Sequence, residues 1–503
     1  MFVWMACRRN RHHRRLKKVQ RGVAILFVGT SLQRTIVMLT AYLLDAAVVV
    51  PDENLGEWLS ETAAYASVLG LQMKGQRAPA TLFPVPLPAS EFQRGRDLAP
   101  LFNILCHRIE HHPTFLKDTL KNVVKMDEFT AKLVEVYDIV HAGPLRQKMA
   151  LYIDRSDYML HNGTMKQVEL NTISSAFGAL SSRLSRLHRL LMSEALPSIS
   201  LPENMADVRI AAGLAAANAA CGLPGSVVML VVQPDEGNAI DQRALQYLLW
   251  EKHGIRSVRR TLGEIGSSGS LEERTFALLL DKNIRVGVAY FRAGYTPRDY
   301  PSDAEWAARL LIEQSSAIRC PTIAHHLAGT KRVQQALSIP GCLEMFFPDA
   351  PDHCQVLRNV FAQQWCFEGS GPSRDVDELI RKALEAPGRY VLKPQREGGG
   401  NNFYGDGLVA QLKKLSREEL EQYVLMERLE PRTYPTVVIK NNEHMRVQNS
   451  VSEFGFYSVW LGGNGDAPLI NECAGYLVRT KALGVDEGGV ATGFSVLDTP
   501  MPF

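Results

Sequence analysis

The alternation of short apolar runs with helical patterns, from about residue 151 onward, constrains the fold of this chain more than any other feature. Helical patterns occupy residues 210–221, 243–252 and 306–320. Runs typical of β-strands lie among them: KQVELN (166–171), SVVMLVV (226–232), VGVAYF (286–291), YVLK (390–393), YVLME (423–427) and FYSVWL (456–461). Strands that alternate with helices form α/β layers rather than a helical bundle. We therefore expect an α/β fold with α+β elements.

Composition and charge argue against two classes of partner. The 503 residues are 46% hydrophobic and 22% charged, which is ordinary globular material for two or three domains. Residues 1–37 hold nine of the 56 Lys and Arg but none of the 53 Asp and Glu, so the remaining chain has a net charge of −6. This deficit argues against a nucleic-acid partner. The uncharged run 210–234 reads as a helix, a Gly-Pro turn and a strand, so no membrane partner is expected either.

The cysteines and the N-terminus bear on location. The eight cysteines are scattered without a C-x-x-C pair, which is typical of free thiols in a reducing compartment, so we expect a cytoplasmic protein. Residues 1–45 leave organelle import open, because CRRNRHHRRLKKVQR followed by GVAILFVG resembles a basic targeting segment. A solvated basic arm, or a start codon assigned upstream of Met38, would explain the same residues. The apolar stretch is short and interrupted by Arg34, which favours the upstream start.

The stretch YVLKPQREGGGNNFYG, residues 390–405, suggests a polyphosphate site. Three consecutive glycines let main-chain N–H groups approach an anion with no Cβ in the way. Lys393 at the end of the predicted strand would supply a cation for phosphate, and Glu397 would supply a carboxylate for Mg²⁺. A flexible surface loop is the alternative interpretation.

A second motif, VELNTIS at residues 168–174, offers ligands for the same cation. Side chains on a strand alternate with period two, so Glu169 and Asn171 should project from one face. Mg²⁺ prefers carboxylate and amide oxygens, so Glu169, Asn171 and Glu397 together form a plausible metal site. A polar edge-strand face is the alternative.

A third motif, VDEGGVATG at residues 485–493, is another small-residue loop able to close over a ligand. Arg479 and Lys481 precede it two residues apart, a spacing that places them on one face of an extended chain. A solvated basic edge is the alternative. HRIEH, residues 107–111, fits a zinc peptidase pattern, although the adjacent His112 favours a simple histidine cluster.

Nine motifs in order resemble those of the eukaryotic glutathione synthetase family of ATP-grasp ligases: RSDYM, VELNTIS, DQRA, YFRAGYTPR, LAGTK, LKPQREGGGNN, LMERLEP, VRTKA and GGVATG. The resemblance runs from TLFP near Thr81 to the C-terminal phenylalanine and leaves out residues 1–45. It implies an ATP-grasp fold with a mobile Gly-rich lid and an inserted α/β substrate-binding subdomain. It also implies a homodimeric, Mg²⁺-dependent ligase that joins γ-glutamylcysteine to glycine at the expense of ATP, through an acyl phosphate.

The resemblance further implies a division of the chain and a set of site residues. The catalytic body would comprise residues 46–225 and 331–503, with a lid at about 365–440, and the substrate-binding subdomain would comprise residues 226–330. Catalysis would involve Arg479, Lys393 and Gly399. The implied ATP contacts are Glu169, Lys331, Lys393, Pro394, Gln395, Arg396, Glu397, Gly398, Gly399, Gly400, Asn401, Asn402, Tyr404, Met426, Glu427, Arg428, Leu429, Glu453, Lys481 and Glu487. The implied contacts to the dipeptide or glycine are Arg155, Ser174, Ser175, Glu236, Asn238, Gln242, Arg292, Tyr295, Arg479, Val490 and Ala491.

Two positions depart from the family pattern. Ala176 stands where the family has a second serine, with Ser175 just before it, and Glu487 stands where aspartate is more usual. Two alternatives to glutathione synthesis stay open. One is a related ATP-grasp ligase that uses another amine acceptor such as β-alanine, and the other is a catalytically inactive binding homologue.

Overall fold

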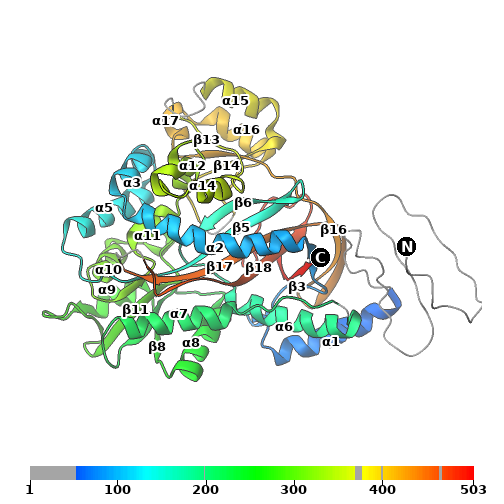
Figure 1. Cartoon of the computed structure of the whole chain (residues 1–503), viewed down its shortest axis with the longest axis horizontal. Coiled ribbons are helices and arrows are strands. Elements are labelled where there is room, and N and C mark those ends of the chain that lie inside the picture. The colour runs from blue at the N-terminus through cyan, green and yellow to red at the C-terminus, as the bar shows by residue number, and fades with distance from the viewer. Residues whose placement is uncertain (1–51, 198, 369–375, 398–399, 464–466) are drawn as a thin grey trace, which may run out of the picture.

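The computed structural model describes residues 52–197, 199–368, 376–397, 400–463 and 467–503. The N-terminal extension predicted at residues 1–45 lies outside the described residues, as do Gly398 and Gly399. Helices and strands alternate through the described chain, so the predicted α/β class is confirmed (Figure 1). None of the described helices combines the length and the apolar character needed to cross a membrane.

A seven-stranded sheet forms the centre of the described chain. Its strand order is β16 (Tyr434–Lys440), β3 (Ala80–Thr81), β19 (Val496–Asp498), β18 (Ile470–Ala482), β17 (Glu443–Gly462), β5 (Ala150–His161) and β6 (Thr164–Asn171). The long strands β6, β5, β17 and β18 are antiparallel neighbours, whereas β16 also pairs with β17 and so curls one end of the sheet back on itself. Strands far apart in sequence thus lie side by side.

Two further sheets flank the centre. The first contains β8 (Ser257–Arg260), β7 (Val227–Val231), β11 (Ile284–Phe291), β10 (Leu278–Leu280) and β9 (Gly269–Leu271), with β12 (Ile318–Cys320) also paired to β11. Its β7, β8, β11 and β12 are parallel neighbours. The central β7 is wholly apolar and buried and β11 nearly so, as expected of strands covered on both faces. The second is a small antiparallel sheet of β13 (Gln364–Cys366), β15 (Val424–Glu427) and β14 (Tyr390–Lys393). Figure 1 shows this small sheet, with its own helices, projecting from the top of the molecule.

The helices cover both faces of the central sheet. The helices include α1 (Asp52–Val68), α2 (Ala89–Glu110), α3 (Pro113–Leu120), α5 (Glu128–Ala142), α6 (Gly178–Ala195), α7 (Ala206–Ala220), α8 (Ala239–His253) and α10 (Asp303–Glu313). In Figure 1, α2 lies on one side of β17 and β18 and α7 on the other. Both contacts are close, since a Cβ at Gly95 of α2 would meet the ring of Phe456, and one at Gly213 of α7 would meet Val459.

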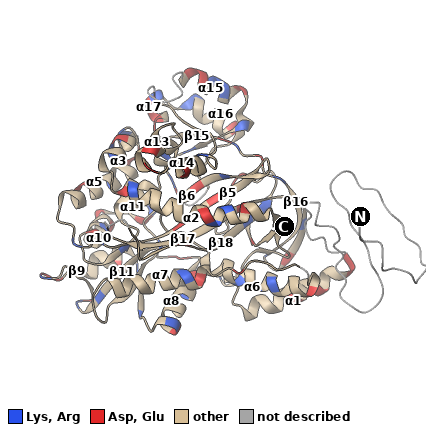
Figure 2. Cartoon of the chain, in the orientation of Figure 1, with Lys and Arg blue, Asp and Glu red and all other residues tan. Residues whose placement is uncertain are grey.

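The remaining elements are short. They are α4 (Val123–Met126), α9 (Leu262–Ser268), α11 (Ile323–Ala328), α12 (Lys331–Leu337), α13 (Cys342–Phe346), α14 (Pro351–Arg358), α15 (Val376–Glu385), α16 (Gly405–Lys414), α17 (Arg417–Leu420), two 3₁₀ turns (Pro297–Asp299 and Pro387–Arg389), and two-stranded pairings of β1 (Gln72–Met73) with β2 (Gln76–Arg77) and β4 (Val85–Leu87) with β20 (Pro500–Pro502). Lys and Arg alternate with Asp and Glu along the outer helices rather than gathering in one patch (Figure 2).

Two elements differ from the sequence expectation. The predicted helix at 306–320 is wrong at its end, because α10 stops at Glu313 and residues 318–320 form β12 against β11. Ser315 ends the helix by accepting a hydrogen bond from the backbone N–H of Ala317. The predicted strand at 456–461 is the end of a much longer strand, β17. The charged first half of β17 hides it from a hydrophobicity pattern, and pairing with β16 holds it in place.

Candidate functional site

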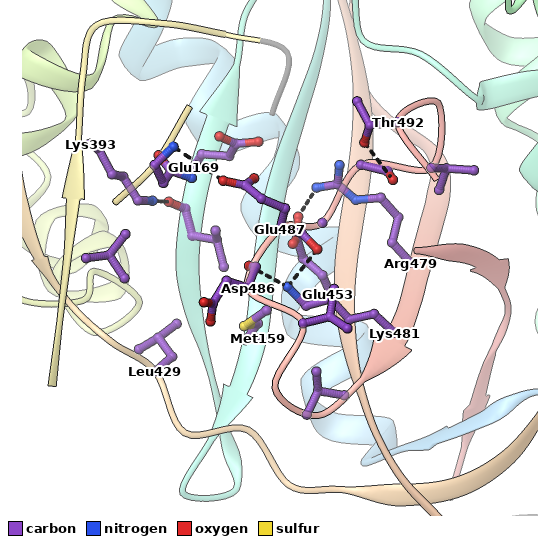
Figure 3. A pocket seen from close by; sticks show the side chains of 18 of the residues that line it. Met159, Glu169, Lys393, Leu429, Glu453, Arg479, Lys481, Asp486, Glu487 and Thr492 are labelled. Atoms are coloured by element: carbon purple, nitrogen blue, oxygen red, sulfur yellow. Dashed lines mark hydrogen bonds and ion pairs between the residues drawn. The ribbon is translucent and has the colours of Figure 1, made fainter. Parts of the chain in front are cut away.

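A cavity of about 460 Å³ lies between the central sheet and the small sheet. Strands β5, β6, β17 and β18 form one wall, the ends of β14 and β15 form another, and residues 484–492 after β18 close it. Figure 3 shows Lys393 reaching in from the small sheet toward Glu169, with Glu453, Arg479 and Lys481 on the opposite side. Side chains from three distant parts of the sequence therefore converge on one space.

The central sheet contributes a row of polar side chains to this cavity through its register. Arg155 and Asp157 of β5 lie opposite Asn171 and Glu169 of β6, respectively. A β-bulge at Val168 follows this pairing, and the carbonyl oxygen that it leaves accepts a hydrogen bond from Lys393 Nζ at 2.9 Å. The period-two prediction that the Glu169 and Asn171 side chains face one space agrees with their places in the cavity wall.

Gly455 of β17 makes room for this polar row. It pairs with Asp157, and a Cβ at this position would stand 2.5 Å from Asp157 Oδ1 and 2.8 Å from Arg155 Cδ. Without a side chain, it lets the Arg155 guanidinium bind both oxygens of Asp157, at 2.6 and 2.8 Å. This glycine is thus required by close approach rather than by a turn.

Arg479 of β18 joins the carboxylates of two other strands. It pairs with Glu453 of β17 and, at 3.0 Å, with Asp157. The Asn171 amide donates to the same Asp157 carboxylate at 3.0 Å. Burial lowers the pKa of Arg479, and the carboxylates oppose this only in part. An arginine held in this way presents a fixed cationic edge to the cavity.

The site also contains a set of oxygen atoms suited to a divalent cation. The carboxylates of Asp157, Glu169 and Glu453 offer oxygen atoms within 4.8 Å of one another. Arg479 holds two of these, which leaves Glu169 as the member of this described group best placed to bind a cation. Burial acts to raise the pKa of Glu169, but Lys331, Lys393 and Arg479 outweigh it and hold the pKa at about 2. Asn171 uses its Nδ2 on Asp157, so its Oδ1 is the atom left to accept.

Two lysines approach Glu169 from outside the central sheet. Lys331, the first residue of α12, donates to Glu397 at 2.9 Å and to the carbonyl of Arg396 at 2.6 Å. Burial lowers the pKa of Lys393 to about 8, although Glu169 opposes that effect. Burial raises the pKa of Glu397 against the pull of Lys331. These groups form one buried and mutually dependent cluster.

The Gly-rich segment after β14 is connected to the loop after β18. The carboxylate of Glu487 accepts hydrogen bonds from the backbone N–H of Gly400 at 2.8 Å and of Asn402 at 3.3 Å. Backbone N–H groups directed at a carboxylate are equally suited to a phosphate oxygen. Lys481 donates to the carbonyls of Asp486 and Glu487, and burial lowers its pKa to about 8 despite the Glu487 carboxylate.

The end of β15 and its continuation supply a different surface. Residues 426–429 line the cavity beside the apolar side chains of Met159 and Val391. Arg428 pairs with Asp486 at 2.8 Å, and its guanidinium lies 5.5 Å from the centre of the Tyr404 ring. An apolar slot bordered by exposed main chain suits a flat aromatic ring that is read by backbone hydrogen bonds.

Other predicted residues form a second polar group beside the cavity, at the start of α8. Gln242 donates to Glu236 at 2.5 Å, and Glu236 accepts from the backbone N–H of Asn238 at 2.7 Å. Both polar atoms of the buried Asn238 amide lack a hydrogen-bond partner among the described residues, and so does Arg292 Nε. Arg292 Nη1 donates to the Ser175 carbonyl at 3.3 Å, which connects this group to the cavity wall. Unpaired buried polar atoms of this kind suit a polar ligand.

The structure brings most of the predicted site residues to the cavity. Its wall includes the predicted residues Arg155, Glu169, Asn171, Ser174, Ser175, Tyr295, Lys393, Glu397, Asn402, Tyr404, Met426, Glu427, Arg428, Leu429, Glu453, Arg479, Lys481, Glu487, Val490 and Ala491. Pro394, Gln395, Arg396, Gly400 and Asn401 belong to the adjoining Gly-rich segment but do not line the cavity among the described residues. Arg396 instead pairs with Asp127 at the start of α5.

Sequence reasoning missed Asp157 and Gly455. Asp157 lies two residues after Arg155, so the period-two argument used for Glu169 could have found it. Gly455 carries no local signal, because its importance arises only from Arg155 and Asp157 on a neighbouring strand. The HRIEH pattern lies elsewhere, where His107 Nδ1 is 3.1 Å from the Tyr152 hydroxyl and the centres of the His107 and Trp460 rings are 4.4 Å apart.

Comparisons with known proteins point to one family. Residues 52–501 match the family model described as "Eukaryotic glutathione synthase, ATP binding domain". The chain is 38% identical over 439 residues to the glutathione synthetase of Dictyostelium discoideum, covering 84% of this chain and 91% of that protein. It is 39% identical over 434 residues to the human glutathione synthetase, covering 84% and 90%.

Two further relatives broaden the comparison. The chloroplastic glutathione synthetase of Arabidopsis thaliana is 40% identical over 432 residues, covering 84% of this chain and 78% of that protein. Among solved structures, a glutathione synthetase-like effector of Globodera pallida in its apo form superposes with a TM-score of 0.72 at 25% identity, covering 90% of this chain and 98% of the other.

Proposed function

The chain belongs to the eukaryotic glutathione synthase family and is therefore an ATP-dependent ligase of glutathione synthesis, and on that premise we propose how its own residues carry out the reaction. The observation that supports this most strongly is the convergence of Lys393, Glu169 and Arg479 from three separate segments on one cavity. Cations for phosphate, carboxylates for a metal and a small-residue closing loop are the parts that carboxylate activation by ATP requires.

The proposed reaction joins γ-glutamylcysteine to glycine in two steps. An oxygen of the cysteinyl carboxylate attacks the γ-phosphorus of ATP, forming an acyl phosphate as the bond from that phosphorus to the bridging oxygen breaks and ADP leaves. The glycine amine then attacks the acyl carbon to form a tetrahedral intermediate. Collapse of this intermediate expels inorganic phosphate, the amine loses its proton, and glutathione is formed.

We assign ATP to the side of the cavity between the two sheets. The apolar slot beside residues 426–429 would hold the adenine, while Lys331 and Lys393 would face the phosphates. The backbone N–H groups of Gly400 and Asn402, which now bond to Glu487, would turn to phosphate oxygens. Gly398 and Gly399 belong to the same segment, and we propose that this segment is the mobile lid. Closure of this segment would keep water from the acyl phosphate.

The amino-acid substrates are assigned to the opposite side. Arg292, Asn238 and Gln242, beside the cavity, have polar atoms suited to the charged ends of a dipeptide, and two of these residues retain unpaired buried atoms. Arg155 and Arg479 line the cavity, and we assign them to the position where negative charge accumulates as the acyl phosphate forms. We propose residues 226–330 as the substrate-binding subdomain on the same grounds.

The donor set also fits Mg²⁺. Glu169, Asn171 and Glu397 would hold it through oxygen atoms, as this hard cation prefers. Bound there, Mg²⁺ would neutralise charge on the ATP phosphates. Glu397 would exchange its ion pair with Lys331 for this role, which frees the Lys331 ammonium for phosphate.

The test is ADP release by the purified protein with ATP, Mg²⁺, γ-glutamylcysteine and glycine, omitting each in turn. Release that requires all four, with glutathione identified by mass, is the expected result. Lys393→Met is the matched control for contaminating ATPase and should release almost no ADP. Release that ignored glycine, or that needed β-alanine instead, would replace this proposal with a related ligase, and no release at all would favour a binding homologue.

We further propose a cytoplasmic homodimer, on the basis of the family resemblance. Sedimentation at micromolar concentration should give twice the chain mass of 55.9 kDa. The Arabidopsis thaliana relative is named as chloroplastic, so the alternative for the basic residues 1–37 is import into an organelle. Fusion of residues 1–50 to a fluorescent protein would separate the two, because a cytoplasmic protein predicts a diffuse signal.

A further inference from the structure

In the loop after β18, residues 484–493, four backbone carbonyl oxygens accept hydrogen bonds from lysine ammonium groups. We call this segment the C-terminal loop. At its first half, Lys481 donates to the carbonyls of Asp486 and Glu487. At its second half, Lys74 donates to the carbonyl of Ala491 at 3.0 Å, and Lys440 donates to that of Gly493 at 2.6 Å.

Lys74 is the most distant of these lysines in sequence and the best placed to join two segments. It occupies the tight turn between β1 and β2 with a positive φ of 51°. Its aliphatic stem crosses Gly237, where a Cβ would stand 2.8 Å from Lys74 Cε. The same side chain therefore packs on the segment before α8 and binds the C-terminal loop at Ala491.

The two halves of the C-terminal loop are fastened to different parts of the site. Its first half is joined to the Gly-rich segment through Glu487 and Gly400, and to the end of β15 through Asp486 and Arg428. Its second half is joined through Lys74 to the segment that contains Asn238. The first connections border the side assigned to ATP, and the second border the side assigned to the amino-acid substrates.

We propose that Lys74 is a positioning residue that fixes the second half of the C-terminal loop over the amino-acid end of the cavity. Its ammonium holds the Ala491 carbonyl outward, so that Val490 and Ala491 form a fixed wall for the dipeptide and the acceptor amine. Lys74 itself touches no reacting atom. This inference rests on the proposed function for the identity of the substrates, but the clamp itself does not.

An exposed lysine on a backbone carbonyl adds little to folding stability, because water competes for both groups. Its removal should therefore leave the fold intact and loosen only the loop. If the substrate must order the loop when it binds, the free energy spent on ordering the loop reduces the binding affinity. We therefore expect weaker binding of the two amino-acid substrates and unchanged binding of ATP.

The decisive variant is Lys74→Met, which keeps the aliphatic stem on Gly237 and removes the ammonium. The KM values for γ-glutamylcysteine and for glycine should rise about tenfold, whereas the KM for ATP should stay within about twofold of wild type. Gly237→Ala should give the same pattern by displacing the stem. Lys74→Arg, which keeps a charged donor, should recover most of the affinity, and Lys252→Met on the outer face of α8 is the matched control with no effect.

Hydrogen exchange tests the clamp independently of activity. In Lys74→Met, the amides of residues 490–494 should exchange several-fold faster than in wild type, while those of residues 400–402 should be unchanged. A wild-type protein without glycine-dependent ADP release would refute the proposed function, yet faster exchange would still establish the clamp. Unchanged exchange would overturn the clamp, and an equal rise in all three KM values would overturn its selectivity for the amino-acid side.

Discussion

The substitution Gly455→Ala tests how the side chains of the site are positioned. Its methyl group would not line the cavity, yet we expect it to lower activity strongly. The Cβ of Gly455→Ala would lie 2.5 Å from Asp157 Oδ1, whereas ordinary contact begins at 3.4 Å. The carboxylate would therefore have to withdraw by about 0.9 Å. Arg155 would have to move as well, since its Cδ would lie 2.8 Å from the new methyl group.

This displacement should damage function more than folding. Asp157 accepts hydrogen bonds from Arg155 at 2.6 and 2.8 Å and from Arg479 at 3.0 Å. A shift of this size would lengthen these distances to the limit of a hydrogen bond or beyond it. Overpacking in a core typically costs about 1–3 kcal/mol, which a chain of this size can tolerate. If the two arginines serve phosphate transfer as proposed, misplacing them by about 1 Å should lower kcat/KM about 100-fold.

The assay compares turnover with stability in Gly455→Ala and in a matched glycine variant. Gly407 lies in α16, where an added Cβ would meet nothing within 4 Å. Gly407→Ala should therefore keep full turnover and gain roughly 0.5–1 kcal/mol of stability from the better helix former. If folded Gly455→Ala turned over within twofold of wild type, the argument that close approach requires this glycine would be wrong.

Two further predictions concern pH. Lys393 and Lys481 have pKa values of about 8, so these ammonium groups lose their protons as pH rises above 8. The kcat/KM for ATP should therefore fall above pH 8. A kcat/KM profile that stays flat from pH 7 to 9.5 would contradict this prediction. Burial acts to lower the pKa of His325, but Asp154 and Glu110 outweigh it and raise the pKa from 6.5 to about 9. The resulting stabilisation is complete below pH 6.5 and is lost as pH rises through 9, so chemical denaturation should show the free energy of unfolding falling by about 3 kcal/mol, with no such slope in His325→Gln.

The sequence identified the parts of the site that repeat along one element. Period two was enough to place Glu169 and Asn171 on one face of β6, because strand geometry dictates which side chains are neighbours. Lys393 could likewise be placed at the end of β14 from the apolar run before it. The α/β class followed from the same alternation of patterns.

The remaining parts depend on contacts that local patterns do not encode. Lys331 begins a short helix and was expected at the site only through the family resemblance, because no local pattern places it beside Glu397, with which it forms an ion pair. Lys74 is an ordinary surface lysine in sequence and acquires a role only where the chain folds back against Ala491. The end of α10 was missed for a related reason, since Ile318 becomes a strand residue through its partner Val288.

The charges in and beside the cavity explain why the proposed reaction should need a metal ion. Six cationic side chains meet there among the described residues: Arg155, Lys331, Lys393, Arg428, Arg479 and Lys481. Eight carboxylates accompany them: Asp157, Glu169, Glu397, Glu427, Glu430, Glu453, Asp486 and Glu487. Because the carboxylates outnumber the cations, the protein has no spare positive charge with which to neutralise the phosphates of ATP and the developing acyl phosphate. The missing charge must arrive with the nucleotide, and the low pKa of Glu169 keeps a carboxylate ready to receive it. ADP release that persisted in excess chelator would contradict this requirement for a metal ion.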